Sequence, residues 1–317
     1  MKRFFLLVVL TAPAIIAETS DDPVVLTLDV ENAVIYRGTV FDASKLAKDP
    51  GPTTSVNQAF VESINIGDIV AINGKPAKGT WSSTAYATPF RSAPQPGQPI
   101  ADFDLAGTNF CTWQLYATDG TFLGMIRDSG AGQGHTVVGA VAGFFGAIGT
   151  HQGGSTTIPT RQASTGEDPA NRRNLGGGKM SVVFYLYPRV RPAVQVTASG
   201  PSIFHVDYSP VTTANPARPG ELLILAATGL GPVKPNLLPP GAVEFSGSPF
   251  QEVNSPVTVV FNGKELPVIN KIGWPGQKTL YWVDFQVPSD ASSGAATLQL
   301  IATWIPGPAV TIAVGAR

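Results

Sequence analysis

The sequence from Phe110 to Asp128 reads FCTWQLYATDGTFLGMIRD. Two runs rich in β-branched and aromatic residues, in which apolar and polar residues alternate, flank Asp119-Gly120. This dipeptide is typical of a two-residue turn because both residues tolerate a positive φ. Such a turn pairs Thr118 with Thr121 and sets the register of the whole hairpin. The further cross-strand pairs are then Ala117 with Phe122, Leu115 with Gly124, Trp113 with Ile126 and Cys111 with Asp128.

One face of this predicted hairpin is apolar except at one end. Side chains alternate across a strand, so these paired residues share a face. We expect Trp113, Leu115, Phe122 and Ile126 to line a ligand-binding surface, with Cys111 and Asp128 as candidate catalytic residues at its end. The opposite face carries Thr112, Gln114, Tyr116, Leu123, Met125 and Arg127.

Two interpretations of Cys111 and Asp128 are open. Burial near Trp113 would raise the pKa of Asp128, which would then act as a general acid or base in a cyclisation. Alternatively, Asp128 ends its strand in contact with water and does nothing chemical, and Cys111 is a small buried apolar residue.

Similar short β-type runs continue outward along the chain, and no run of ten or more residues shows a sustained helical period. They are Val24 to Val30, Ala33 to Phe41, Phe60 to Ile66, Asp68 to Ile72, Gly79 to Tyr86, His135 to Val141 and Met180 to Tyr187. Turn signals such as Asn73-Gly74 separate them. This spacing predicts an antiparallel β-barrel over residues 24–188, interrupted by two long mobile loops, Pro89 to Pro99 and Gln152 to Gly178.

A second all-β domain follows a proline-bounded linker at residues 189–201. Asn262-Gly263 lies between two apolar runs and is the strongest hairpin signal in the chain. Six or seven short strands in this part predict an immunoglobulin-like β-sandwich over residues 202–317. Trp274, between Gly273 and Pro275, is expected in a loop as an exposed ligand contact.

The second half resembles the Solibacter C-terminal domain found in many secreted proteins of acidobacteria. Six ordered blocks carry the resemblance: Pro201-Ser202-Ile203-Phe204, Ala214-Asn215-Pro216-Ala217-Arg218-Pro219-Gly220-Glu221, Ala227-Thr228-Gly229-Leu230-Gly231-Pro232, Asn254-Ser255-Pro256-Val257, Phe285-Gln286-Val287-Pro288 and Trp304-Ile305-Pro306-Gly307-Pro308. The resemblance implies an extracellular, appended β-sandwich and transfers no catalytic residue.

The stretch from Ile64 to Tyr187 is similar to the eight-stranded barrels of the allene oxide cyclase and dirigent type. A late glycine-rich phrase carries this resemblance through Gly139, Phe144, Gly146, Ala147 and Gly149, while Ala140 and Ala142 stand where glycines are common. The resemblance implies a lumen that binds or cyclises small apolar molecules, or a barrel that serves only as a scaffold.

The first residues are typical of a secretory signal peptide. Lys2 and Arg3 precede an apolar run from Phe4 to Ile16, which predicts cleavage after Ala17, or after Ala14. No later apolar stretch reaches the ~20 residues of a membrane helix, so we expect a secreted protein, periplasmic or extracellular, that does not span the membrane.

Composition and motifs exclude several function classes. A net charge of -1 gives no overall electrostatic attraction to nucleic acid, so a nucleic-acid-binding function is not expected. Cys111 is the single cysteine, which excludes an internal disulfide. The hydrolase pattern G-x-S-x-G and the metalloprotease pattern H-E-x-x-H are both missing from the sequence. The three histidines, His135, His151 and His205, fall on both sides of the predicted domain boundary, so no metal site or cofactor is expected.

Two hypotheses of function remain. The first is a secreted or surface-associated non-enzymatic β protein with a binding or assembly role, whose partner is a small apolar molecule, a glycan, a protein or a second copy of the chain. The second is a cyclase, isomerase or lipophilic-ligand binder that acts in the barrel lumen. A lumen packed with side chains would favour the first hypothesis.

Overall fold

The computed structural model of the chain describes residues 22–37, 61–87, 108–131, 134–153, 156–164, 166–234 and 244–316. Within these ranges the helical elements are a short 3-10 helix, η2 (Pro169–Asn171), and a single turn, α1 (Arg172–Leu175). Everything else with regular structure is β-strand, so the all-β prediction is confirmed. The predicted signal peptide and the Pro89 to Pro99 loop lie outside the described residues.

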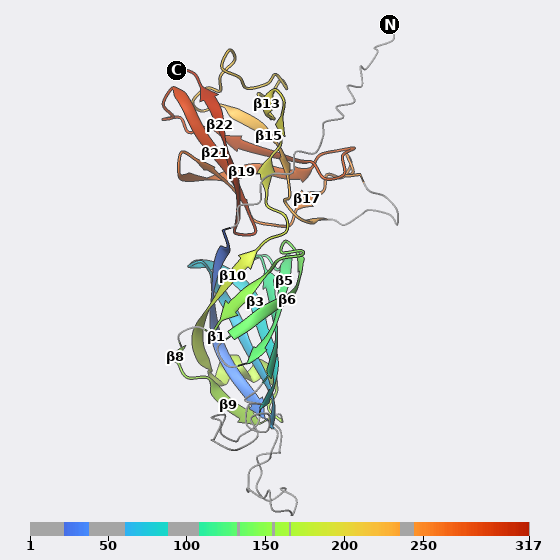
Figure 1. Cartoon of the computed structure of the whole chain (residues 1–317), viewed down its shortest axis with the longest axis vertical. Coiled ribbons are helices and arrows are strands. Elements are labelled where there is room, and N and C mark those ends of the chain that lie inside the picture. Colours follow the sequence, from blue (N-terminus) through green and yellow to red (C-terminus); the bar gives the residue numbers. More distant parts are fainter. Residues whose placement is uncertain are drawn as a thin grey trace, which may run out of the picture.

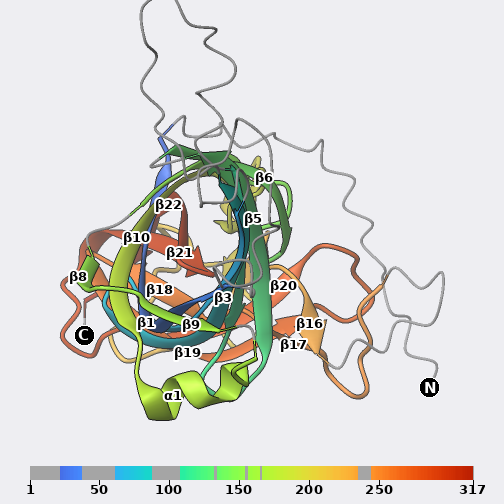
Figure 2. The ribbon, with the colours of Figure 1, turned by 90° about the horizontal axis from the view of Figure 1, so that it is seen from below.

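The first half of the chain is a closed barrel of eight antiparallel strands, which confirms the predicted barrel. Its strands are β1 (Val24–Arg37), β2 (Val61–Ile72), β3 (Lys75–Ala87), β4 (Thr108–Tyr116), β5 (Phe122–Ala131), β6 (Gly134–Ala142), β7 (Ile148–Gln152) and β10 (Gly178–Tyr187). Sequential neighbours pair from β1 to β7, and β10 pairs with both β7 and β1. The ring of strands is visible end-on in Figure 2.

Tight turns and irregularities shape the barrel strands. Asn73 and Gly74 both have positive φ, 49° and 73°, and join β2 to β3 in the predicted two-residue turn. The two predicted runs from Val24 onward form one strand, β1, as far as Arg37, and residues 38–41 lie outside the described part of the chain. The register of β1 shifts between Val30 and Ala33 around Asn32, a residue with φ of 52°. Such an irregularity bends β1 while its pairing with β10 continues on both sides of it.

The hairpin of β4 and β5 differs from its prediction at the turn. Ala117, not Thr118, closes the turn, since its N–H donates to the Thr121 carbonyl at 2.8 Å and its carbonyl accepts from Gly120 N–H at 2.9 Å. The loop therefore has three residues and ends on Gly120, whose φ is +90°. Phe122 pairs with Tyr116 instead of Ala117, and the register then shifts before Leu115 pairs with Gly124.

The segment from Gln152 to Gly178, predicted to be a long mobile loop, carries four short elements: β8 (Thr156–Ile158), β9 (Arg161–Ser164), η2 and α1. Strand β8 pairs with β10, and β9 runs parallel to β1. Arg172 of α1 is 6% exposed and its Nη2 donates to Asp68 Oδ1 of β2 at 2.5 Å, while Arg173 Nη2 binds the same oxygen at 2.8 Å. The prediction of a continuous loop is therefore wrong, because paired strands and ion pairs fix this segment to the barrel.

The second half forms a further antiparallel sheet around a separate apolar core. Its path runs β11 (Ala193–Val194), β15 (Leu222–Thr228), β20 (Tyr281–Gln286), β19 (Lys264–Gly273), β18 (Val257–Phe261), β21 (Gly294–Ala302) and β22 (Ile305–Val314). Shorter strands are β12 (Val196–Thr197), β13 (Gly200–Pro201), β14 (Ile203–Phe204), β16 (Val233–Lys234) and β17 (Glu252–Val253). The Asn262-Gly263 hairpin is confirmed, since φ is positive at both residues and Phe261 pairs with Lys264.

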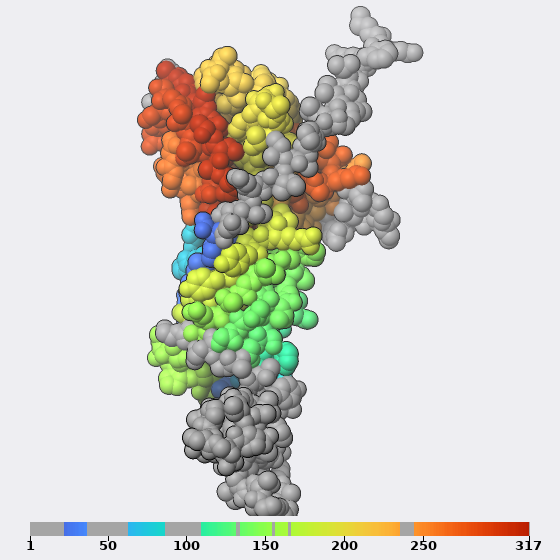
Figure 3. Space-filling model, in the orientation of Figure 1, coloured from blue at the N-terminus to red at the C-terminus, as the bar shows by residue number. Residues whose placement is uncertain are grey.

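The two halves lie end to end and touch at one end of the barrel (Figure 1). Ile305, at the start of β22, is 3% exposed and belongs to the apolar core of the barrel, and Trp304 packs against that core. Exposed ion pairs such as Lys75–Glu265, at 2.5 Å, also join the halves. In the space-filling view the second half, in orange and red, sits directly on the barrel (Figure 3).

The helical elements of the described residues, η2 and α1, are short. None of the helical elements there has the length and hydropathy to cross a bilayer.

Candidate functional site

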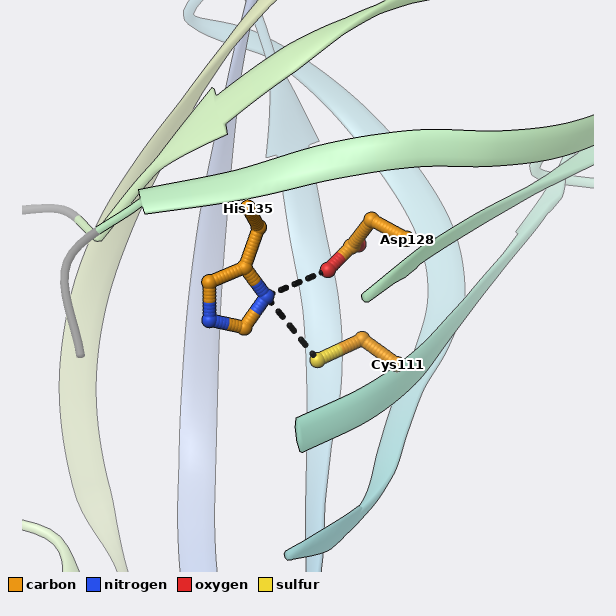
Figure 4. A group of neighbouring side chains, drawn as sticks. All are labelled: Cys111, Asp128 and His135. Atoms are coloured by element: carbon orange, nitrogen blue, oxygen red, sulfur yellow. Dashed lines mark hydrogen bonds and ion pairs between the residues drawn. The ribbon is translucent and has the colours of Figure 1, made fainter. Parts of the chain in front are cut away.

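Four inward-facing side chains from four consecutive barrel strands meet at one point of the lumen. Cys111 comes from β4, Asp128 from β5, His135 from β6 and His151 from β7, and their exposed fractions are 5%, 1%, 7% and 5%. We call these four residues the lumen cluster. Figure 4 shows Cys111, Asp128 and His135 pointing toward one another, with one ring nitrogen of His135 in contact with both of the other side chains.

Register explains why these residues converge. Cys111 and Asp128 are direct cross-strand partners, as the sequence predicts. His135 lies opposite Gly130 on one side and His151 on the other. Gly130 leaves no room for a side chain, since a Cβ there would lie 2.9 Å from the His135 ring, so the imidazole folds over the backbone of β5 toward Asp128.

The carboxylate of Asp128 is the centre of the lumen cluster. Its Oδ1 lies 2.6 Å from His135 Nδ1 and 3.1 Å from His151 Nδ1, and its Oδ2 accepts from Trp113 Nε1 at 2.5 Å. Burial by itself raises the pKa of Asp128, but the adjacent imidazole of His151 and the hydrogen bonds from His135 and Trp113 outweigh it and lower that pKa. The expectation of a raised pKa is therefore wrong, because the sequence did not reveal these three neighbouring groups.

Cys111 is held as a neutral thiol. Its Sγ lies 3.8 Å from His135 Nδ1. Burial, and then the negative charge of Asp128, raise the pKa of the thiol to about 12. A thiol with such a pKa is not a nucleophile at neutral pH, because the thiolate is the reactive form. Behind it, Asn65 Nδ2 donates to Ser83 Oγ at 2.7 Å, and Ser83 is the cross-strand partner of Cys111.

Aromatic rings fill the lumen beside the cluster. Trp113 stacks on Trp81 at a centroid distance of 5.7 Å and meets Phe184 edge-on at 5.3 Å. His151 contacts Trp113 and Phe184 at 5.4 Å and 5.0 Å. Leu115 and Ile126 are fully buried in the same apolar core. The predicted ligand-lining residues Trp113, Leu115 and Ile126 thus pack against protein side chains.

Two predicted ligand contacts lie elsewhere. Phe122 is wrong as a lumen residue: it is 37% exposed and contacts Tyr116 on the outer face, whereas Leu123, predicted outside, is 1% exposed. The three-residue turn and the bulge after it exchange these two side chains. Trp274 follows β19 in the second half, is half-buried, and packs at a tilt against Trp282 with a centroid distance of 5.2 Å.

Sequence reasoning missed His135 and His151 as site residues. A signal existed for His135, because it begins a predicted strand and alternation places it on the face of Val137, which is buried. His151 had no such signal, since its strand β7 has five residues and starts with Ile148-Gly149. Only the pairing of β6 with β7 brings the two rings to 4.4 Å.

The lumen cluster offers donor atoms that suit a metal ion. The ligand atoms of Cys111, Asp128 and His135 all lie within 4.8 Å of one another. Thiolate sulfur, imidazole nitrogen and carboxylate oxygen are the three ligand types that zinc takes in proteins. The sequence-based expectation of no metal site did not foresee this convergence.

Comparison with known proteins adds no relative to this picture. No protein-family model matches the chain, and no curated protein matches it.

Proposed function

We propose that the chain is an exported, non-enzymatic binding protein whose binding centre is the lumen cluster. The observation that carries this proposal is that Asp128, 1% exposed, is contacted by side-chain nitrogens of three residues on three strands. Burying ionisable groups costs free energy that an apolar core does not, so a fold does not need such a cluster for stability. Strongly perturbed buried groups that converge in this way are typical of functional sites.

The ionisation of the cluster favours binding over catalysis. A thiol pKa of about 12 leaves Cys111 without a reactive thiolate, and the lowered pKa of Asp128 keeps it a carboxylate that gives up no proton near neutral pH. The rings of Trp113 and Phe184 also occupy the lumen beside the cluster. These features support a small, tightly enclosed ligand.

The remainder of the chain fits an exported protein with an attachment module. Residues 24–188 would form the binding domain, and residues 202–317 an appended immunoglobulin-like β-sandwich of the Solibacter type. The antiparallel sheet, the separate core and the Asn262-Gly263 hairpin of the second half support this assignment. Export is supported by the signal-like residues Met1 to Ala17.

The alternative, a cyclase, isomerase or lipophilic-ligand binder in the lumen, has less support. It needs an apolar space along Trp113, Leu115 and Ile126, and these residues pack within one core with exposed fractions of 0–1%. An anilinonaphthalene sulfonate dye would distinguish the two. We expect no dye uptake by the native protein, whereas saturable uptake would favour the alternative.

The proposal is tested by asking whether the cluster is needed for folding. Asp128→Leu, His135→Leu, His151→Phe and Trp113→Phe together replace the polar contacts with apolar groups of similar size. The native protein and this four-residue variant are each dialysed against EDTA and unfolded in urea. We expect a free energy of unfolding equal to the native value or higher by up to about 1–4 kcal/mol, as when buried ion pairs are replaced by apolar groups.

Leu115→Ala is the control, because Leu115 is fully buried in the same core. This change should cost about 2–5 kcal/mol. If the four-residue variant lost as much stability as the control, the cluster would be a structural network and the binding role would be refuted.

A further inference from the structure

We infer that the ligand of the lumen cluster is a divalent transition-metal ion of the zinc class, bound by Cys111, Asp128 and His135, with the adjacent His151 as the fourth ligand. This inference rests on the proposed binding role of the same site. The four side chains supply one sulfur, one oxygen and two nitrogens, a set that favours zinc-like ions. Calcium and magnesium prefer sites made wholly of oxygen ligands.

The separations between donor atoms suit a tetrahedral ion. With bonds of about 2.0–2.3 Å, tetrahedral geometry places ligand atoms roughly 3.3–3.6 Å apart. Cys111 Sγ to His135 Nδ1 is 3.8 Å, and Asp128 Oδ1 to His151 Nδ1 is 3.1 Å. The 2.6 Å contact between Asp128 and His135 is a hydrogen bond, and an ion would replace its proton. Cys111, Asp128 and His135 thus lie close enough to share an ion, whereas the His151 ring would have to shift toward them to become a fourth ligand.

His151 gives an independent indication of a ligand. Its Nδ1 is buried and lies 3.1 Å from Asp128 Oδ1, but the geometry of this contact is not that of a hydrogen bond. A buried nitrogen prefers a well-directed partner, and a metal ion bound by its lone pair would supply one. The ring lies against Trp113 and Phe184, which keep it beside Asp128.

Groups around the cluster orient the ligands. Trp113 Nε1 binds Asp128 Oδ2 and leaves Oδ1 directed at the two histidines. Hydrogen bonds to a metal ligand from a residue that does not itself bind the ion fix the orientation of that ligand and strengthen metal binding. Cys111 would bind as a thiolate, and its proton would pass to water when the ion enters, because a coordinating thiol is deprotonated. With four protein ligands the ion has no open position, which agrees with a non-catalytic site.

The test is metal analysis of the full chain. Protein stripped with EDTA is incubated with zinc chloride or with magnesium chloride, desalted and analysed for metal per chain. We expect one zinc and no magnesium. Substitution with cobalt should add the near-ultraviolet charge-transfer absorption of a cobalt–thiolate bond, and that absorption should vanish in Cys111→Ser.

The second half provides a matched control. His205 is 7% exposed and its Nδ1 lies 2.7 Å from Glu221 Oε1, so it is also a buried histidine on a carboxylate, but outside the barrel. His135→Gln should lose the zinc, and His205→Gln should keep it. Circular dichroism establishes that each variant is folded, and His151→Phe replaces His135→Gln if that variant does not fold.

Three outcomes would overturn the inference: substoichiometric zinc in the native chain, equal zinc loss in His205→Gln, or cobalt absorption that persists in Cys111→Ser. These outcomes are separable from failure of the binding role. If no zinc binds while the four-residue apolar variant keeps native stability, the binding role stands and the metal inference falls. If that variant is strongly destabilised, the binding role falls as well.

Discussion

Cys111 and Asp128 are direct cross-strand partners on β4 and β5, although the turn between these strands is one residue longer than the sequence indicates. The register shift between Tyr116 and Leu115 adds one residue on β5 and cancels the extra turn residue. Two departures from regular pairing thus leave the distal end of the hairpin in the register predicted for an ideal turn. The barrel-wall position of Asp128 depends on both.

Removing the Asp128 charge should destabilise the free protein. In Asp128→Asn one of the two accepting oxygens becomes an NH2 donor, so the groups at Oδ1 and the Trp113 Nε1 at Oδ2 cannot all keep an acceptor. We expect a loss of about 1–3 kcal/mol in urea unfolding of the EDTA-treated protein. Trp113→Ala should cost more, about 3–5 kcal/mol, because it also empties a fully buried ring position. A silent Asp128→Asn would mean that the hydrogen bonds contribute no net stability.

Acid should remove the stabilisation supplied by Asp68. Burial raises the pKa of this carboxyl, but the hydrogen bonds from Arg173, Asn32 and Arg172 prevail and lower it. The folded-state pKa is therefore below the unfolded value of about 3.9, and the contribution is present at neutral pH and lost as the pH falls through the folded-state pKa.

We therefore expect Asp68→Asn to be destabilised relative to the native protein at pH ~7, with the difference shrinking below pH ~4. Urea unfolding of both proteins across that range checks it. Glu167→Gln is the control, since the Glu167–Arg161 pair is more exposed and should show little change. A difference between native protein and Asp68→Asn that is constant with pH would contradict the assignment.

The turn between β4 and β5 can be tested with two glycines. Gly120 and Gly139 both have open space where a Cβ would stand, but only Gly120 has a positive φ, +90°. Gly120→Ala should lose about 1 kcal/mol, because left-handed backbone is costly for alanine. Gly139→Ala should be neutral or stabilising, because alanine loses less backbone entropy on folding. Equal effects in thermal unfolding would show that Gly120 does not adopt this turn conformation.

Ile305 should stabilise the barrel although it belongs to the second half. It is 3% exposed within the core of the barrel, so Ile305→Ala should cost about 2–5 kcal/mol. Ile269→Ala, on β19, makes the same chemical change at a residue that is 63% exposed and should have little effect. If the two variants unfolded alike, the contact between the halves would not contribute to stability.

Exported protein should begin near Glu18. The apolar run from Phe4 to Ile16 is shorter than a membrane helix and ends at Ala17, where signal peptidase would cut. Amino-terminal sequencing of protein recovered outside the cytoplasm measures this directly. Recovery of a chain that starts at Met1 would contradict export through a cleaved signal.

Local sequence determined the strands and their inward faces. Alternation along Phe110 to Asp128 placed Cys111 and Asp128 on one face, and their predicted pairing holds because the extra turn residue and the register shift cancel. Asn73-Gly74 and Asn262-Gly263 marked hairpins that the structure contains. These features depend on residues close in the chain, where the period of the strand and the φ preference of the turn residues dominate.

Tertiary structure alone decided the chemistry of the lumen. The bulge that buries Leu123 and exposes Phe122 depends on side-chain packing in the closed barrel. The local sequence pattern does not encode that packing. His151 reaches Asp128 only because β7 pairs with β6 and the sheet curves into a ring. Once the ring closes, donors from β4, β6 and β7 reach one carboxylate, and their contacts reverse the pKa shift that burial alone would produce.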